Sequence, residues 1–218
     1  MKPTTLKGGK ADRKFGQKLF LKPFRGESPK AAFTRRGYKP GAHGQSRVRG
    51  RSRSEEYGLQ LLEKQKIRAV YGISDKAFKR IVRESETSVR TGASSKNVLD
   101  LITENLEQRL DSIVHRAGFA PSRSVARQLI SHGHIAVNGR RVTVRSMALR
   151  KGDVVSIRKE SRGKALFADI AATLKKHKAS KWVDVDADNF SATLTGVPAR
   201  EEALADLDLS KVVEFYAR

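Results

Sequence analysis

The sequence predicts an α+β protein in which helices pack on a small antiparallel sheet. Three observations support this fold class. Apolar side chains in residues 97–117 recur at intervals of three and four, which is the spacing of one helix face. Residues 122–139 have the pattern of a helix, a glycine stop, a short strand and a tight turn. A second turn, at residues 151–153, precedes a further predicted strand at residues 154–158.

Residues 1–53 are expected to form a basic, extended arm. They contain sixteen Lys and Arg against two Asp and Glu, and they lack apolar periodicity. Such a segment buries too little apolar surface to fold alone. We therefore expect it to become ordered on a polyanion, the alternative being a solvated tail with no target. Alternate positions would turn to one side of an extended chain, and four of them are Arg47, Arg49, Arg51 and Arg53.

The next segment predicts two helices. The first covers about residues 54–71 and ends at Gly72. Ser74 is a predicted N-cap for the second, which includes residues 76–83. Residues 91–95 then form a linker. The side chains expected in the interior of this region are Tyr57, Tyr71, Phe78, Ile81 and Val82.

Two further helices are predicted in the middle of the chain. Residues 97–117 indicate one continuous helix with Gly118 placed to end it. The next helix follows Ser122, and 100° spacing turns one apolar face inward, formed by Val125, Ala126, Leu129 and Ile130. Three polar residues recur at i, i+4 and i+8 on the outer side, namely Arg123, Arg127 and Ser131. Replacing the two arginines with Ala should then weaken binding to a polyanion and leave thermal stability nearly unchanged.

The remaining elements are short. Asn138-Gly139 is a strong signal for a type I′ hairpin, which would set Ile135 opposite Val142. The other predicted elements are a helix at 166–176, strands at 182–184 and 191–194, and a packed terminal helix at 209–216.

The charge balance points to nucleic acid as the partner. The chain of 218 residues has a formal net charge of +22, and a polyanion would relieve the resulting self-repulsion. Residues 107–164 hold thirteen Lys and Arg against four Asp and Glu, so internal salt bridges cannot account for the excess. Residues 183–218 are acidic overall and are expected to face away from the polyanion.

Other classes are disfavoured. A membrane surface is the competing partner, but we find no long apolar run, no Trp-anchored amphipathic segment and no signal peptide. The lack of cysteine excludes disulfides, cysteine-ligated zinc and thiol catalysis, and it is compatible with a cytosolic location. The five histidines are scattered, and His132 and His134 lack neighbouring ligands, so no metal or other cofactor is expected.

Several strings resemble the family of bacterial-type small-subunit ribosomal protein four. In the middle of the chain, which we call the central module, they are residues 105–111, 122–138 and 151–156. Outside it they are RGYKPGAHG at 36–44, YGLQ at 57–60, EKQK at 63–66, YG at 71–72 and VEFYAR at 213–218. Many relatives carry four N-terminal cysteines that bind zinc, so this chain resembles the zinc-free form. Residues 1–34 match the family poorly.

The resemblance implies an architecture and a function. The basic arm, 1–53, would precede a helical domain formed by 54–95 and completed by about 200–218, with an RNA-binding domain, 96–199, inserted between. The protein would be a non-enzymatic, primary ribosomal RNA binder that nucleates small-subunit assembly and contributes to translational accuracy. It would lie on the cytoplasmic ribosome near the path by which messenger RNA enters, beside small-subunit protein five.

The candidate RNA contacts are cationic, polar or aromatic side chains of the arm, the helical domain and the central module. For any single one, an ordinary solvated or structural role is the alternative. The set is Arg35, Arg36, Tyr38, Lys39, His43, Arg47, Arg49, Arg51, Arg53, Lys64, Lys66, Arg109, Arg116, Ser122, Arg123, Arg127, Gln128, Ser131, His132, His134, Asn138, Arg140 and Arg141.

Two alternative functions use a similar RNA-binding domain. One is an RNA-modifying enzyme, since Arg109-Leu110-Asp111 resembles a triplet of pseudouridine synthases in which the aspartate is the nucleophile. Here Gln108 precedes the triplet, and the predicted continuous helix would misplace a catalytic carboxylate. The other is a ribosome-associated stress factor, a class that is shorter and lacks the 36–44 and C-terminal strings.

Overall fold

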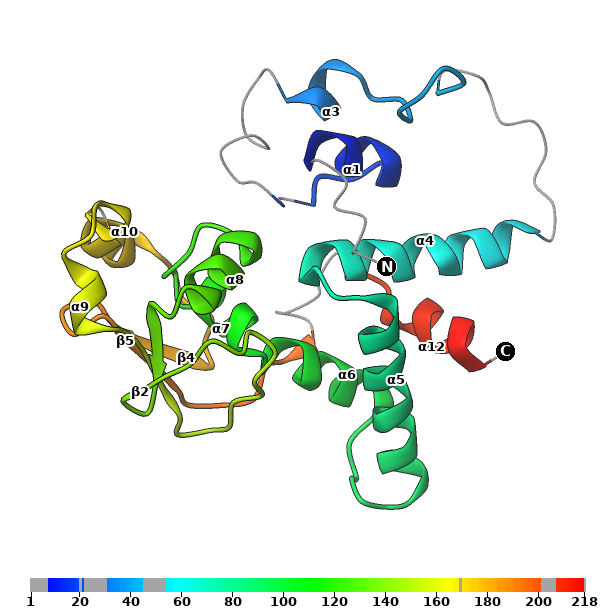
Figure 1. Ribbon diagram of the computed structural model, residues 1–218. Coiled ribbons are helices and arrows are strands. Elements are labelled where there is room, and N and C mark those ends of the chain that lie inside the picture. Colours follow the sequence, from blue (N-terminus) through cyan, green and yellow to red (C-terminus); the bar gives the residue numbers. More distant parts are fainter. Residues whose placement is uncertain are drawn as a thin grey trace. The chain divides into compact units, whose positions relative to one another are not determined.

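The computed structural model describes residues 8–19, 21, 31–44, 54–168, 170–200 and 207–217. The predicted arginine row at positions 47–53 lies outside these residues. The chain forms two compact units (Figure 1). The helical unit comprises Met1–Leu99 and Leu204–Arg218, and the sheet unit comprises Asp100–Ala203.

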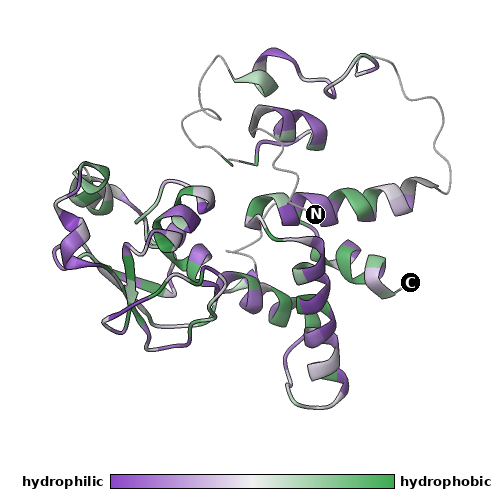
Figure 2. Cartoon of the chain, viewed as in Figure 1, coloured by the Kyte–Doolittle hydropathy of each residue, from purple (hydrophilic) through white to green (hydrophobic). Residues whose placement is uncertain are grey.

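The C-terminal helix completes the helical unit, as predicted. It packs against both long helices, and the Phe215 ring lies 5.5 Å from that of Tyr57 while the Tyr216 ring lies 6.2 Å from that of Phe78. Figure 2 shows apolar and polar residues interleaved along the long helices, as expected for helices buried on one side. The elements are α1 (Gly8–Phe15), α3 (Ala32–Arg35), α4 (Ser54–Tyr71), α5 (Asp75–Arg90) and α12 (Leu209–Ala217).

The arm is not extended throughout, which corrects the prediction for this segment. Gly8–Phe15 is an α-helix whose residues Ala11 and Phe15 are buried. These two apolar side chains are four residues apart and form one short stripe, too short to be recognised as a period in the sequence. The helix is fixed by Arg13, whose guanidinium lies 4.8 Å from the Tyr38 ring centroid, and by Lys14, which donates to Gln65 Oε1 at 2.8 Å.

Helix α5 begins as predicted and ends later. The Ser74 hydroxyl accepts from the backbone N–H of Ala77 at 3.2 Å, which confirms the N-cap. The predicted inward side chains Phe78, Ile81 and Val82 are buried. The helix continues to Arg90 without apolar periodicity, and in this part the hydroxyls of Ser85 and Ser88 donate to the carbonyls of Ile81 and Glu84.

The two tyrosines predicted in the core differ. Tyr71 is 1% exposed, which confirms its core position. Tyr57 is 47% exposed, so its predicted burial is wrong. It lies in the first turn of α4, where the ring of Phe215 covers one side of it and the other side faces solvent.

The sheet unit confirms the α+β prediction. Its five strands form one antiparallel sheet in the order β2-β1-β3-β5-β4. The strands are β1 (Ile135–Val137), β2 (Arg140–Arg141), β3 (Val154–Ile157), β4 (Val183–Asp186) and β5 (Ser191–Leu194). The helices are α6 (Val98–Glu107), α7 (Leu110–Arg116), α8 (Arg123–Ser131), α9 (Lys159–Arg162), the 3-10 helix η1 (Ala165–Phe167) and α10 (Ile170–Lys176).

The predicted continuous helix at 97–117 is wrong, because α6 and α7 are separate helices. Arg109 has extended backbone and forms an isolated antiparallel bridge with Ala148. The loop that follows β2 hydrogen-bonds to the backbone here, which interrupts the helix. Leu110 N donates to Met147 O at 2.9 Å, and Leu149 N donates to Gln108 O at 2.9 Å. Those contacts are far apart in sequence, so helical periodicity does not reveal them. Gly118, with φ of 81°, ends α7 as predicted.

The hairpin register is as predicted. Asn138 and Gly139 have φ of 48° and 79°, the positive values that a type I′ turn requires. The Val142 N–H donates to Ile135 O at 3.2 Å, which sets these two residues opposite each other. The third strand, the last two strands and the terminal helix occur close to their predicted positions, whereas the helix predicted at 166–176 is divided into η1 and α10. Within the described residues, no helix combines the length and apolar character needed to cross a bilayer.

Candidate RNA-binding surface

Helix α8 is anchored by its cap and its apolar face. The Ser122 hydroxyl accepts from Val125 N at 3.4 Å, and Ser122 is 7% exposed, so this candidate contact serves as an N-cap. The predicted inward face is confirmed: Ala126, Leu129 and Ile130 are buried, and Val125 is packed against the core. The helix therefore presents its remaining side chains from a fixed position.

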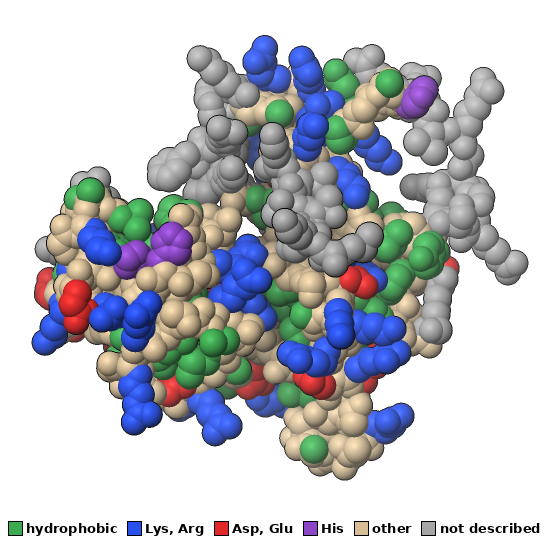
Figure 3. Space-filling view, in the orientation of Figure 1, with side chains coloured by type: hydrophobic (Ala, Val, Ile, Leu, Met, Phe, Trp, Pro, Cys, Tyr) green, Lys and Arg blue, Asp and Glu red, His purple; other side chains and the backbone are tan. Residues whose placement is uncertain are grey.

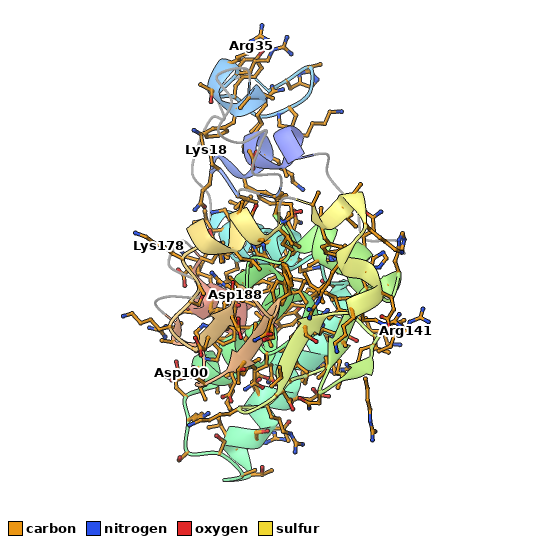
Figure 4. All side chains as sticks on the ribbon, turned by 90° about the vertical axis from the view of Figure 1, so that its left-hand side faces the viewer. Lys18, Arg35, Asp100, Arg141, Lys178 and Asp188 are labelled. Carbon is orange, nitrogen blue, oxygen red and sulfur yellow. The ribbon has the colours of Figure 1, made fainter. Side chains whose placement is uncertain are left out.

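Gly133 brings the hairpin close to the end of α8. Its φ of 73° ends the helix, and His134 N donates back to Leu129 O at 3.0 Å. A Cβ at Gly133 would lie 2.3 Å from Arg141 Nε, so glycine is what allows the Arg141 guanidinium to lie against the backbone there. Figure 4 labels Arg141, whose side chain lies at the periphery of the sheet unit.

We call the exposed side chains at the end of α8 and on the hairpin the hairpin surface. They come from the last turn of α8, from the residue that caps it and from β2. All are polar, two are arginines, and none is buried. The Ser131 hydroxyl already donates to Arg127 O at 2.7 Å, so toward a partner it can only accept. The hairpin surface consists of Gln128, Ser131, His132, Arg140 and Arg141.

His134 is partly buried next to this surface. Its Nδ1 lies 3.0 Å from Ser161 Oγ, and its ring centroid lies 5.8 Å from that of Phe167, with the two rings edge to face. Burial, followed by the charge of Lys164, lowers the pKa of His134, which favours the neutral ring at pH 7. His132 lies 6.1 Å away, but across the described part of the chain no three His, Cys, Asp or Glu residues form a group suited to a metal.

Two buried carboxylates lie beneath the first turn of α8. Glu107 is fully buried and accepts from Arg116 at 2.9 and 3.0 Å and from Arg123 at 3.1 Å. Asp111 is 1% exposed and accepts two hydrogen bonds from Arg109, at 3.0 and 3.1 Å. Because a buried charge is tolerated only when it is paired, these arginines are structural counterions as well as surface cations.

The predicted row of arginines along the outer side of α8 therefore needs correction. The side chains of Arg123 and Arg127 are only 12% and 19% exposed. Arg127 Nε lies 3.9 Å from Asp111 Oδ2 and donates to Arg123 O at 3.1 Å. The carboxylates come from α6 and α7, so the spacing within α8 alone could not reveal the pairing.

The cluster nevertheless keeps an excess of positive charge. Burial lowers the pKa of Arg127; Asp111 opposes this, and Arg145, Arg109 and Arg123 add to it. Arg145 was not predicted as a site residue; its backbone carbonyl accepts from Asp111 N at 3.2 Å, which places it at the cluster. An anion such as a phosphate would stabilise partly buried guanidinium groups arranged in this way. We call Arg109, Arg116, Arg123, Arg127 and Arg145 the arginine cluster.

Three other candidates have internal roles. Lys64 is 7% exposed, pairs with Asp75 at 2.9 Å and lies 4.3 Å from the Phe215 ring centroid. Lys66 is 9% exposed and pairs with Glu63 at 2.6 Å. These two lysines are not free surface cations. The Asn138 amide donates to Asp153 at 2.8 Å and accepts from Val154 N at 2.9 Å, which ties the hairpin turn to β3.

Of the arm candidates at positions 35–43, which the structure describes, all but Tyr38 are exposed. Figure 3 shows Lys and Arg side chains gathered over the arm. The Tyr38 ring is half-buried beneath Arg13, and the exposed candidates are Arg35, Arg36, Lys39 and His43. The structure thus divides the sequence candidates into exposed donors, arginines that hold buried carboxylates, and purely internal residues.

Comparison with known proteins covers nearly the whole chain. Residues 5–103 match the family described as ribosomal protein S4/S9 N-terminal domain, and residues 108–155 match the S4 domain. The chain is 40% identical to small ribosomal subunit protein uS4 of Syntrophomonas wolfei and 41% identical to the uS4 proteins of Thermus thermophilus and Gloeobacter violaceus. Each alignment spans 206 residues and covers 94% of this chain and of the relative.

Proposed function

Since the chain belongs to the small ribosomal subunit protein uS4 family, we propose that it is a structural constituent of the small ribosomal subunit that binds ribosomal RNA. The observation that carries this function is the hairpin surface, a set of exposed polar side chains held on a rigid helix and hairpin. Polar and cationic side chains with no Phe, Tyr or Trp among them suit the phosphates and 2′-hydroxyls of folded RNA, which is recognised largely by shape.

We further propose how the contacts are shared. The hairpin surface and the exposed arm cations, Arg35, Arg36 and Lys39, neutralise phosphates directly. The arginine cluster attracts phosphate through its excess of positive charge, at positions fixed by Glu107 and Asp111. Because the carboxylates fix the arginine cluster before binding, its side chains lose little conformational entropy when the RNA docks.

The finer roles rest on the family resemblance. We propose that the protein binds ribosomal RNA early, initiates assembly of the small subunit and contributes to translational accuracy. Its neighbours would be small-subunit protein five and messenger RNA near the point where it enters, on the ribosome of the cytoplasm. Recovery in stoichiometric amounts with purified small subunits, and crosslinking of the bound protein to its neighbours, would test this placement.

An RNA-modifying enzyme is not favoured. Asp111 lies at the start of α7, not within a continuous helix, so the helical argument against catalysis does not hold. The stronger reason is burial: its carboxylate is 1% exposed and bound on both oxygens by Arg109, so it cannot reach a base. A short stress factor is not favoured either, because residues 5–103 match the ribosomal N-terminal domain.

Binding to small-subunit ribosomal RNA tests the proposal directly. Affinity should fall by orders of magnitude between about 50 and 200 mM salt, because several phosphates are neutralised. Replacing both Arg140 and Arg141 with Ala should reduce the slope of log affinity against log salt by about 2. A flat salt response, or no preference for the folded transcript over heparin, would contradict the proposed function.

A further inference from the structure

The exposed side of α5 carries a stripe of positive charge. On the 3.6-residue period its five cations fall within an arc of about 100°, opposite the buried face that contains Phe78 and Val82. All five are exposed. We call them the α5 stripe: Lys76, Lys79, Arg80, Arg83 and Arg90.

The acidic residues of this helix do not neutralise the stripe. Asp75 is turned toward α4, where it pairs with Lys64 at 2.9 Å and Arg68 at 3.3 Å. Glu84 lies at the flank and pairs with Arg80 at 3.6 Å, with both side chains more than 60% exposed. In the described part of the chain, no ion pair joins Lys76, Lys79 or Arg83 to an acid. Glu86, the third acid of the helix, lies beside the stripe, so Glu84 and Glu86 together reduce its charge. Five cations against these two acids leave the stripe with a net positive charge, and Figure 3 shows Lys and Arg side chains gathered over α5.

The chemistry of this face fits one kind of partner. Four of its cations line an open hollow along the helix together with Thr87, Ser88 and the carboxylate of Glu84; Arg90 lies outside it. No aromatic or large apolar side chain of α5 is exposed there, so the face has no aromatic platform for unpaired bases. Donors spaced along a straight helix match the regular phosphates of a double helix, which is recognised through its backbone.

We propose that the α5 stripe is a second RNA-binding surface, which docks on the phosphate backbone of a double-helical segment. This inference rests on the proposed function, since it assigns a further contact to the same ribosomal RNA. It adds a contact from residues outside the sequence-predicted set.

The test compares two triple variants by their binding to the small-subunit ribosomal RNA transcript. The stripe variant carries Lys76→Ala, Lys79→Ala and Arg83→Ala, which keep a good helix former at exposed positions. The matched control loses the same charge at exposed positions of the sheet unit through Lys151→Ala, Lys178→Ala and Arg200→Ala. Thermal melting should be nearly unchanged in both, because the replaced side chains are exposed.

The stripe variant should bind about tenfold or more weakly at moderate salt, with a salt slope lower by about 2 to 3, because about 0.9 is lost per phosphate. It should also lose affinity for a short RNA duplex and not for a single strand of equal length. Equal losses in the stripe and control variants, or loss on the single strand alone, would overturn the inference. If the wild-type protein itself shows no preference for the transcript over heparin, the proposed function fails instead.

Discussion

At the scale of single residues, two buried carboxylates decide what the surrounding arginines can do. Glu107 and Asp111 hold arginines from three segments of the chain. The expectation that Arg123 and Arg127 can be removed without loss of stability is therefore reversed. Removing them would strip buried carboxylates of counterions, which is costly even where a buried pair adds little net stability.

Replacing Glu107 with Ala tests this role. The free energy of unfolding should fall by about 3 to 5 kcal/mol, because Arg116 and Arg123 would be left as poorly solvated, uncompensated charges. Urea denaturation measures it. The matched control is Glu160→Ala, which removes an exposed carboxylate paired with Arg158 at 3.2 Å and should cost less than about 1 kcal/mol. Similar losses in the two variants would show that Glu107 has no special role.

His115 makes stability depend on pH. Burial, then the charges of Arg123 and Arg116, lowers its pKa to about 4, although the Ala120 carbonyl and Glu107 oppose the shift. The unfolded chain therefore binds a proton at higher pH than the folded one. Stability due to the neutral ring is full above about pH 6.5 and is lost as pH falls toward 4.

The comparison variant is His115→Gln, which cannot titrate in this range. The difference in unfolding free energy between wild type and variant should shift against the wild type by about 3 kcal/mol from pH 7 to pH 4. Denaturation at several pH values measures it. Parallel pH profiles would show that His115 is not held neutral by its surroundings.

At the scale of elements, the turn between β1 and β2 shows most clearly how a local residue choice determines the fold. Gly139 has φ of 79°, and a Cβ added there would have no atom within 4 Å, so its replacement is limited by backbone strain and not by a clash. Gly139→Ala should cost about 1 to 2 kcal/mol. Gly58→Ala, at an exposed position inside α4 with equal free space, should instead stabilise by about 0.5 to 1 kcal/mol. Thermal denaturation of both variants shows whether each change lowers or raises stability. A loss of stability in both variants would contradict the prediction.

At the scale of the whole molecule, the N- and C-terminal parts of the sequence form one unit. Helix α12 supplies Leu209 and Val212 to the interior and covers Phe78 with Tyr216. The sheet unit has its own apolar core, built around residues such as Leu110, Ile130 and Ile157. Each unit therefore has a separate source of stability.

Deleting residues 207–218 should loosen the helical unit alone. The amides of α4 and α5 should exchange hydrogen faster, because the apolar surface under α12 becomes exposed, while those of β1 and β3 keep their protection. Hydrogen exchange followed by mass spectrometry measures the protection of the helical unit and of the sheet unit separately. Equal loss of protection in β3 would mean that the units do not fold independently.

Features that depend on neighbouring residues or on totals could be predicted from the sequence alone. The Ser74 and Ser122 caps, the inward face of α8 and the Asn138-Gly139 turn are set by side chains a few residues apart. The charge excess, and with it the class of partner, is a sum over composition. Such features are readable because nothing distant is needed to produce them.

Tertiary contacts, in contrast, decide where a helix is interrupted and which cations form ion pairs within the protein. The break between α6 and α7 arises from the loop around Met147, some forty residues away. Lys64 and Arg123 carry the same charge as Arg141, yet the first two bind carboxylates and Arg141 faces outward. The cause is that a side chain's surroundings are set by elements distant in sequence, which bring the acid, the ring or the solvent that it meets.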